Sequence, residues 1–201
     1  MAPAGRPKSF DTTEALEAAM AVFWEHGFDG ASIGSLVAAM GIGRQSLYDT
    51  FTDKRGLYLA ALEHYGQRAV AKTLALLDAP GEPADRIRAV FEQWLALQTQ
   101  PDCQGCFMAN TLAELDRSDD AVAGVVDKLQ ASLADAFART VAEAQRRGQL
   151  RDDLAAEDIA AMLTAIGHGL ALAGRSPSNR TLVPAGVRAT IGFLGLTAPA
   201  H

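Results

Sequence analysis

The sequence has few of the features that mark secreted, disulfide-rich or membrane-spanning proteins. Two cysteines among 201 residues are too few for a disulfide framework. The longest apolar run without a charge, residues 159–174, is shorter than the ~20 residues that a membrane span needs. The opening stretch MAPAGRPKSFD lacks the apolar centre of a signal peptide. We therefore expect a cytoplasmic protein without a membrane partner.

Strand patterns and internal repeats are also lacking. We find no convincing apolar–polar alternation and no repeat with a period of about 20 to 50 residues, which argues against a solenoid. Apolar residues make up 49% of the chain and charged residues 21%, a composition typical of a globular protein with a core. Nearly every segment has helical periodicity. The sequence therefore predicts an all-α fold of about nine helices.

Three short helices and a long fourth one are predicted in the first part of the chain. Their starts carry residues that cap helices well, such as Asp11 and Ser32, and their ends carry glycines. The expected ranges are 11–27, 32–41, about 43–51, and a fourth helix that Thr52 caps.

Further helices are predicted beyond a turn at residues 79–85. The segment QPDCQGC, residues 100–106, interrupts them, and residues 175–180 form another loop. Periodic apolar residues indicate helices before and after residues 100–106, from about 119 to 147, from Asp153 or Asp158 onward, and over 182–196.

The charge balance gives no clear sign of a nucleic-acid partner. The net charge of −6 argues mildly against one. Residues 1–57 carry seven acidic and five basic side chains, so their balance is −2. The five basic residues lie near the amino terminus and around residues 44–55: Arg6, Lys8, Arg44, Lys54 and Arg55.

The stretch GIGRQSLYDTF, residues 41–51, has the dimensions of the turn and second helix of a helix-turn-helix. Leu47 and Phe51 are four residues apart and would anchor this helix to a core. The triplet Arg44-Gln45-Ser46 would then point outward, where such a helix meets base edges in the major groove. The alternative is an ordinary solvated helix face.

The positions of two cations favour the first interpretation. Arg44 and Lys54 are expected in the first turns of their helices, where a positive charge opposes the helix dipole by roughly 0.3–1 kcal/mol. An external anion such as a DNA phosphate would compensate, because helix N-termini also offer backbone N–H groups to it. A helical scaffold without DNA binding would leave both placements unexplained.

Residues 10–62 resemble the DNA-binding domain of the TetR family of bacterial transcriptional repressors, especially in the run HGFDGASIGSLVAAMGIGRQSLYDTFTDKRGLYLAAL over residues 26–62. The resemblance implies that Ser32 and Tyr48 bond to phosphates and that Lys54 contacts the backbone. It places Gln45 and Ser46 at base edges and Arg44 at the groove rim. Two arm residues, Arg6 and Lys8, would follow the backbone or enter the minor groove. Asp49 departs from the family pattern, because family members often carry an aromatic, polar or basic residue at this position. A carboxylate beside phosphates would cost affinity unless it accepts from cytosine N4.

The resemblance also implies two domains, a DNA-binding domain over residues 1–53 and a ligand-binding and dimerisation domain over residues 54–201. Large side chains of the second part are candidates to line a pocket for an unknown small-molecule effector, with plain core packing as the alternative. They are Tyr65, Phe91, Trp94, Phe107, Met108, Leu112, Phe137, Met162 and His168.

The last two helices are the expected homodimer interface, because their small residues would allow helices to approach closely. These are Ala160, Ala161, Ala165, Gly167, Gly169, Ala171 and Gly174, with Phe193 and Leu194 adding apolar surface. The resemblance implies that the dimer binds a palindromic operator and that an effector releases the dimer from the DNA. The fourth helix, which joins the two domains, would transmit the effect of the effector to the DNA-binding domain. Activators also occur in the family.

Cys103 and Cys106 form a CxxC pair, but an enzyme or metal site is not expected from it. Thiol oxidoreductases place CxxC after a strand, and structural zinc needs four ligands; neither pattern is present. We expect no cofactor. Cys106, in the first turn of a helix starting near Gly105, is a candidate thiol sensor, because a helix N-terminus stabilises a thiolate. Cys103 would resolve its sulfenic acid into a disulfide. Two points argue against this role. The negative charge of nearby Asp102 would disfavour a thiolate, and cysteine is often a buried structural residue.

Overall fold

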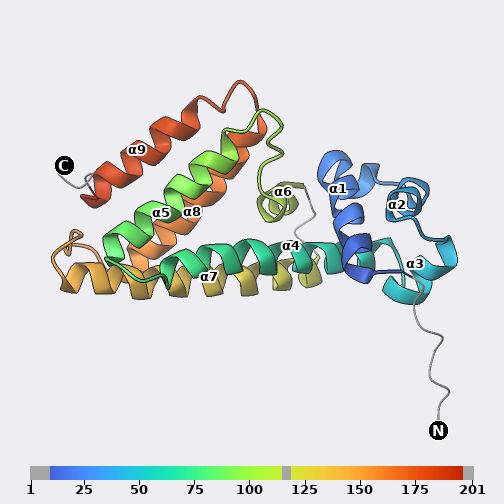
Figure 1. The fold of residues 1–201 in the computed structure, drawn as a ribbon, viewed down its shortest axis with the longest axis horizontal. Helices are drawn as coiled ribbons and strands as arrows, with labels where there is room; N and C mark the ends of the chain where they lie inside the picture. The colour runs from blue at the N-terminus through green and yellow to red at the C-terminus, as the bar shows by residue number, and fades with distance from the viewer. Residues whose placement is uncertain (1–9, 115–118, 197–201) are drawn as a thin grey trace, which may run out of the picture. The chain divides into compact units, whose positions relative to one another are not determined.

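The computed structural model describes residues 10–114 and 119–196 of the chain. These ranges contain nine α-helices and no β-strand (Figure 1). The predicted all-α fold is therefore confirmed. The chain divides into two compact units, one ending at Tyr65 and one beginning at Gly66, and the division falls inside α4 (Lys54–Leu77). None of the helices in these ranges combines the length and apolarity needed to cross a membrane.

The amino-terminal unit consists of α1 (Thr12–Gly30), α2 (Ile33–Met40), α3 (Arg44–Phe51) and the first part of α4. Asp11 caps α1, because its Oδ1 accepts from the backbone N–H groups of Thr13 and Glu14 at 2.7 and 3.3 Å. Gly27 has a φ of 70° and interrupts α1 at its predicted end. The core of this unit is formed by side chains that are at most 2% exposed: Phe23, Leu36, Leu47, Leu57 and Tyr58.

The junction between α3 and α4 differs from the prediction. Thr52, with a φ of 70°, is the C-cap of α3. The Asp53 Oδ1 accepts from the Gly56 backbone N–H at 2.7 Å and so caps α4. A Cβ at Gly56 would lie 2.1 Å from the Phe51 carbonyl oxygen, so only glycine fits this tight passage. The prediction that Thr52 caps the fourth helix is therefore wrong, because the carboxylate one residue later takes that role.

The carboxy-terminal unit contains the rest of α4 and five further helices. These are α5 (Pro83–Gln98), α6 (Phe107–Glu114), α7 (Asp120–Arg146), α8 (Ala156–Arg175) and α9 (Leu182–Leu194). Helices α5, α8 and α9 lie side by side, and α7 packs against α5 and α8 (Figure 1). Their facing side chains form one apolar core that includes Phe91, Phe137, Val141, Ile159, Leu163 and Val187.

Two glycines let α5 and α8 approach closely. A Cβ at Gly167 would lie 2.5 Å from the Trp94 ring, and one at Gly174 would lie 2.7 Å from the Gln98 side-chain oxygen. Ala160 and Ala171 are also buried in this chain. Part of the small-residue set expected at a dimer interface therefore serves packing within the chain.

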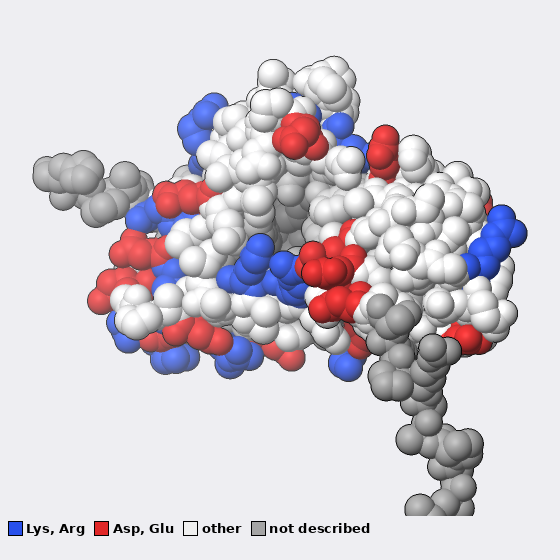
Figure 2. Space-filling view, turned by 45° about the vertical axis from the view of Figure 1, so that its right-hand side comes forward, with Lys and Arg blue, Asp and Glu red and all other residues white. Residues whose placement is uncertain are grey.

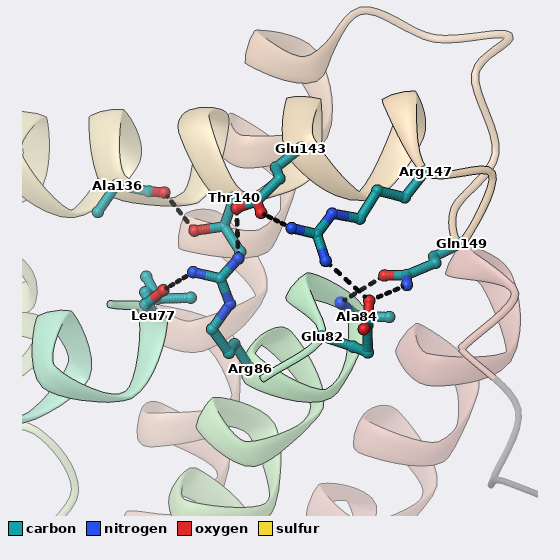
Figure 3. A network of polar contacts seen from close by, with 9 residues as sticks. All are labelled: Leu77, Glu82, Ala84, Arg86, Ala136, Thr140, Glu143, Arg147 and Gln149. Atoms are coloured by element: carbon teal, nitrogen blue, oxygen red, sulfur yellow. Dashed lines mark hydrogen bonds and ion pairs between the residues drawn. The ribbon is translucent and has the colours of Figure 1, made fainter. Parts of the chain in front are cut away.

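A polar network joins the end of α4, the start of α5 and the end of α7 (Figure 3). Arg86 donates to the Leu77 carbonyl at 2.8 Å and pairs with the Glu143 carboxylate. Arg147 bridges Glu143 and Glu82 at 2.7 and 3.0 Å. The Arg86 guanidinium lowers the pKa of Glu143 below its ordinary value, so this carboxylate stays charged at neutral pH. These hydrogen bonds and ion pairs therefore link the ends of three helices to one another.

Candidate nucleic-acid interface

A tight turn joins α2 to α3. Gly41 ends α2 with a φ of 65°, in the left-handed region that favours glycine, and its N–H and that of Ile42 bond back to the last turn of the helix. Gly43 is the N-cap of α3. Leu47 is fully buried and Phe51 is buried on the same face. The turn and these two anchors hold α3 as a short helix with a solvent-facing side.

The polar triplet lies on that outer side. Arg44 and Gln45 are exposed, Ser46 is half-buried, and Tyr48 is 44% exposed. Gln45 and Asp49 are not independent, because Gln45 Nε2 donates to Asp49 Oδ1 at 2.7 Å. The structure thus presents a row of hydrogen-bonding groups on α3, with one amide already oriented by a carboxylate.

Ser32 has a structural role at the start of α2. Its Oγ accepts from the Ser35 backbone N–H at 3.0 Å, and the Ser35 hydroxyl accepts from the Ser32 N–H at 3.1 Å, which forms a capping box. Ser32 is exposed. The N-terminus of α2 is therefore ordered, and the serine lies at its outer edge.

Lys54 has partners within the protein. Its Nζ lies 4.5 Å from the centre of the Phe28 ring and 3.4 Å from the Asp29 carbonyl oxygen. A cation–π contact of this kind stabilises a lysine in the first turn of a helix. The position of Lys54 thus has an internal explanation, and the expectation that an external anion alone accounts for it is too strong.

The arm residues Arg6 and Lys8 lie outside the described residues. Figure 2 shows acidic and basic side chains next to one another over part of the face drawn there, and uncharged surface over much of the rest. The net charge of the chain is −6, so its overall charge does not favour a nucleic-acid partner. Local hydrogen-bonding groups on α3, rather than the overall charge, are therefore the feature that indicates nucleic acid.

The aromatic pocket candidates largely pack against one another. Trp94 contacts Phe91 and Phe137 edge-on, with ring centres 5.2 and 5.9 Å apart, and both phenylalanines are fully buried. Phe107 and Met108 are also buried. These contacts are those of a packed core between α5, α7 and α8.

The remaining pocket candidates are dispersed. Tyr65 belongs to the amino-terminal unit, where its ring lies 5.0 Å from that of Trp24. Leu112 is 49% exposed, and Met162 is half-buried against the core. Burial lowers the pKa of His168 below its ordinary value, which favours the neutral imidazole at neutral pH. No single cluster in the described chain unites all nine candidates.

The two cysteines both lie in the α5–α6 loop, and both are half-buried with free thiols. Cys103 Sγ donates to Gln98 Oε1 at 3.2 Å and accepts from the Gly105 N–H at 3.3 Å. Cys106 precedes α6 rather than lying in its first turn, and its carbonyl accepts from the Asn110 N–H at 2.9 Å. The expected helix start is therefore corrected by about two residues, which puts Cys106 at the cap position.

Sequence reasoning missed the Gln45–Asp49 pair and the contacts of Lys54. The first had a visible signal, because a glutamine and an aspartate four residues apart on one helix are neighbours on its surface. The contacts of Lys54 had no signal in the sequence, since Phe28 and Asp29 come close to Lys54 only because α1 packs against α4.

Family comparisons agree with this arrangement. Residues 15–61 match the family described as bacterial regulatory proteins, tetR family, and residues 83–186 match the tetracyclin repressor-like C-terminal domain. An uncharacterised HTH-type transcriptional regulator of Bacillus subtilis, YezE, is 35% identical over 74% of this chain and 77% of its own. The HTH-type transcriptional repressor ComR of Escherichia coli is 30% identical over 87% of this chain and 84% of its own.

A solved structure extends the similarity to the fold. A cysteine mutant of the TetR family regulator CifR, complexed with 26-base-pair operator DNA, has a TM-score of 0.76 and 26% identity. The match covers 92% of this chain and 99% of that chain. Both units of the protein are therefore accounted for by one family, whose members regulate transcription rather than catalyse reactions. The chain belongs to the TetR family of bacterial transcriptional regulators.

Proposed function

We propose that the protein is a transcriptional repressor that binds a palindromic operator as a homodimer and releases it when an effector acts on its carboxy-terminal part. The observation that carries this proposal is the exposed row of polar side chains on α3, held outward by buried Leu47 and Phe51. The operator complex of CifR supports it. Residues 1–53 would be the DNA-binding domain, and residues 54–201 the ligand-binding and dimerisation domain.

Each polar residue of this surface has a proposed role. Gln45 and Ser46 would reach base edges in the major groove, and Arg44 would lie at its rim. Ser32, Tyr48 and Lys54 would contact phosphates, and the arm residues Arg6 and Lys8 would follow the backbone or enter the minor groove.

An exposed apolar stripe on α8 and α9 supports the homodimer. Ala161, Ala165, Gly169 and Leu172 are exposed at helical spacing on α8, and Leu172 is 42% exposed. Several exposed residues on α9 are also small or apolar, among them Ala185, Ala189, Gly192 and Phe193. A monomer in water rarely leaves such a stripe uncovered, so a second copy would bury it.

The effector would act by favouring a dimer whose α3 helices no longer fit two successive major grooves. Its effect on DNA binding equals the difference between its affinities for the two dimer states. One candidate is an apolar ligand among the side chains of α5 to α8 named above. The other is a thiol-reactive compound that modifies Cys106.

A mobility-shift assay tests the proposal most simply. The full-length protein would be titrated into DNA from upstream of its own gene, with a scrambled fragment of equal length as competitor. We expect a retarded band that survives an excess of the scrambled fragment. Equal competition by both fragments would refute operator binding.

Gln45→Ala and Lys54→Met are expected to weaken DNA binding in different ways. Loss of Gln45 should cost about 1–3 kcal/mol on the preferred operator and leave scrambled DNA unaffected. Lys54→Met keeps an apolar stem over Phe28 but removes the charge, so binding to both DNAs should fall alike and the salt slope should decrease by about one. Fluorescence anisotropy at several salt concentrations measures both effects. Identical behaviour of the two variants would overturn the assigned roles.

Cys106→Ser is expected to abolish release of DNA by peroxide. Peroxide oxidises the Cys106 thiol to a sulfenic acid and is itself reduced to water; the Cys103 thiol then forms a disulfide and releases a second water. Wild-type protein should leave its operator after peroxide treatment, whereas Cys106→Ser should remain bound. Cys103→Ser is the matched control, because it blocks only the disulfide. If wild-type protein stays bound to its operator and mass spectrometry shows that Cys106 is unmodified, the thiol-sensor role is refuted and an apolar ligand remains as the proposed effector.

A further inference from the structure

The side chains of Gln45 and Asp49 form a hydrogen-bonded pair on the exposed side of α3. Gln45 Nε2 donates to Asp49 Oδ1 at 2.7 Å, and both residues are exposed. An ionised carboxylate has no proton to donate, so the amide must turn its nitrogen toward it. The amide oxygen therefore faces away from Asp49, and the hydrogen bond favours this orientation of Gln45 before any ligand arrives.

This pair uses one of the two N–H groups of the amide. A free glutamine could bind adenine by accepting from N6–H with its oxygen and donating one N–H to N7. It could also turn both N–H groups toward the two acceptors of guanine, O6 and N7. With one N–H held by Asp49, an oxygen and a single N–H remain. That combination matches adenine and leaves one guanine acceptor without a partner.

The charge of Asp49 acts in the same direction. Guanine presents only acceptors at its purine edge in the major groove, so a nearby carboxylate repels it, whereas adenine offers an N6–H donor. The same charge repels the phosphates of every DNA sequence, a cost that is offset only where the carboxylate accepts from a base donor such as cytosine N4. A residue that costs affinity on most sequences and disfavours one base most is suited to discrimination.

We propose that Asp49 is a specificity-determining residue that orients Gln45 so that the protein selects adenine over guanine at two symmetry-related operator positions. The inference rests on the proposed function, because it requires α3 to lie in the major groove. Asp49 acts here as a positioning residue, and Gln45 is the group that touches the base.

Selection from a random double-stranded DNA library tests this inference, because the library contains every candidate operator sequence. Full-length wild type, Asp49→Asn and Gln45→Ala would each be incubated with the library, and bound DNA would be sequenced. Asparagine keeps the shape of aspartate but can donate as well as accept, so the Gln45 amide is free to turn over. Glu25→Gln is the charge control, because Glu25 is exposed on α1 of the same unit and pairs with His26 on the same helix.

Wild type should select adenine at the two positions, and Asp49→Asn should lower the adenine-to-guanine ratio there by about tenfold. Asp49→Asn should also bind mixed-sequence DNA more tightly than wild type. Glu25→Gln should keep the wild-type base preference. Circular dichroism of each variant checks that the helices are intact.

Failure of the inference and failure of the proposed function give different results. An Asp49→Asn protein that keeps the wild-type ratio, or a Gln45→Ala protein that keeps the preference for adenine, would overturn the role of Asp49 while operator binding stands. Wild type that enriches no sequence from the library would overturn both.

Discussion

Replacement of Gly169 by leucine is expected to convert the protein from a dimer to a monomer without unfolding it. Gly169 is exposed on α8, and a Cβ there would meet no atom within 4 Å in its own chain. Leucine also favours helix over glycine by up to about 1 kcal/mol, so the isolated chain has no reason to lose stability. In a closely packed interface, the extra side chain would force the helices apart.

The size of this effect follows from two-fold symmetry. An overpacked side chain costs about 1–3 kcal/mol, and a two-fold interface contains the substitution twice. A loss of about 2–6 kcal/mol of dimerisation free energy corresponds to roughly 30- to 20,000-fold weaker association. Sedimentation velocity at micromolar concentration measures it, and operator affinity should fall in parallel because two linked recognition helices bind far better than one.

Gly124→Leu is the matched control for this experiment. Gly124 is an exposed glycine inside α7, and a Cβ there also meets nothing within 4 Å. Because Gly124 is on α7 and does not belong to the stripe on α8 and α9, Gly124→Leu should remain a dimer. A wild-type protein that sediments as a monomer, or a Gly169→Leu protein that dimerises normally, would contradict the proposed interface.

Phe23→Ala is expected to unfold the amino-terminal unit and abolish binding to all DNA sequences. Phe23 is 1% exposed, and its ring packs edge-on against Tyr58 with centres 4.9 Å apart. Truncation of a buried phenylalanine typically costs about 3–5 kcal/mol, through lost burial and the cavity that remains. A unit of this size has a small core, so that loss is a large part of its stability.

Two measurements separate this effect from a general loss of structure. Urea unfolding followed by circular dichroism should show an early transition for Phe23→Ala that wild type lacks. Sedimentation should still give a dimer, because the proposed interface lies in the other unit. Phe23→Leu, which keeps most of the volume, should lose far less stability. Full DNA affinity in Phe23→Ala would show that this ring does not support α3.

Local sequence signals predicted much of this fold, because caps and glycines act over a few residues. Asp11 caps α1 as expected, Ser32 caps α2, and Gly41 ends α2 in the left-handed conformation. One misplaced cap, Thr52, lies beside an aspartate, a residue type that caps helices at least as well. Sequence alone could not decide between the two neighbours, since the choice depends on the backbone conformation at Thr52.

Features that depend on packing between distant segments were harder to predict. The small residues of α8 appeared as one set in the sequence, but Gly167 and Gly174 face α5, whereas Gly169 faces outward. Their separation into two faces needs the position of Trp94, which lies far away in sequence. Among the polar candidates, the sequence identified α3 correctly as an exposed helix, while the carboxylate that holds Gln45 was interpreted only as a departure from the family pattern.

Hydroxyl-radical footprinting of the wild-type protein on a DNA fragment selected from the random library tests the central claim most directly. A two-fold dimer that places one α3 in each of two successive major grooves should protect two stretches related by a dyad, with centres about 34 Å, or roughly 10 base pairs, apart on one face of the duplex. A single protected stretch, or uniform protection without a preferred position, would contradict the account.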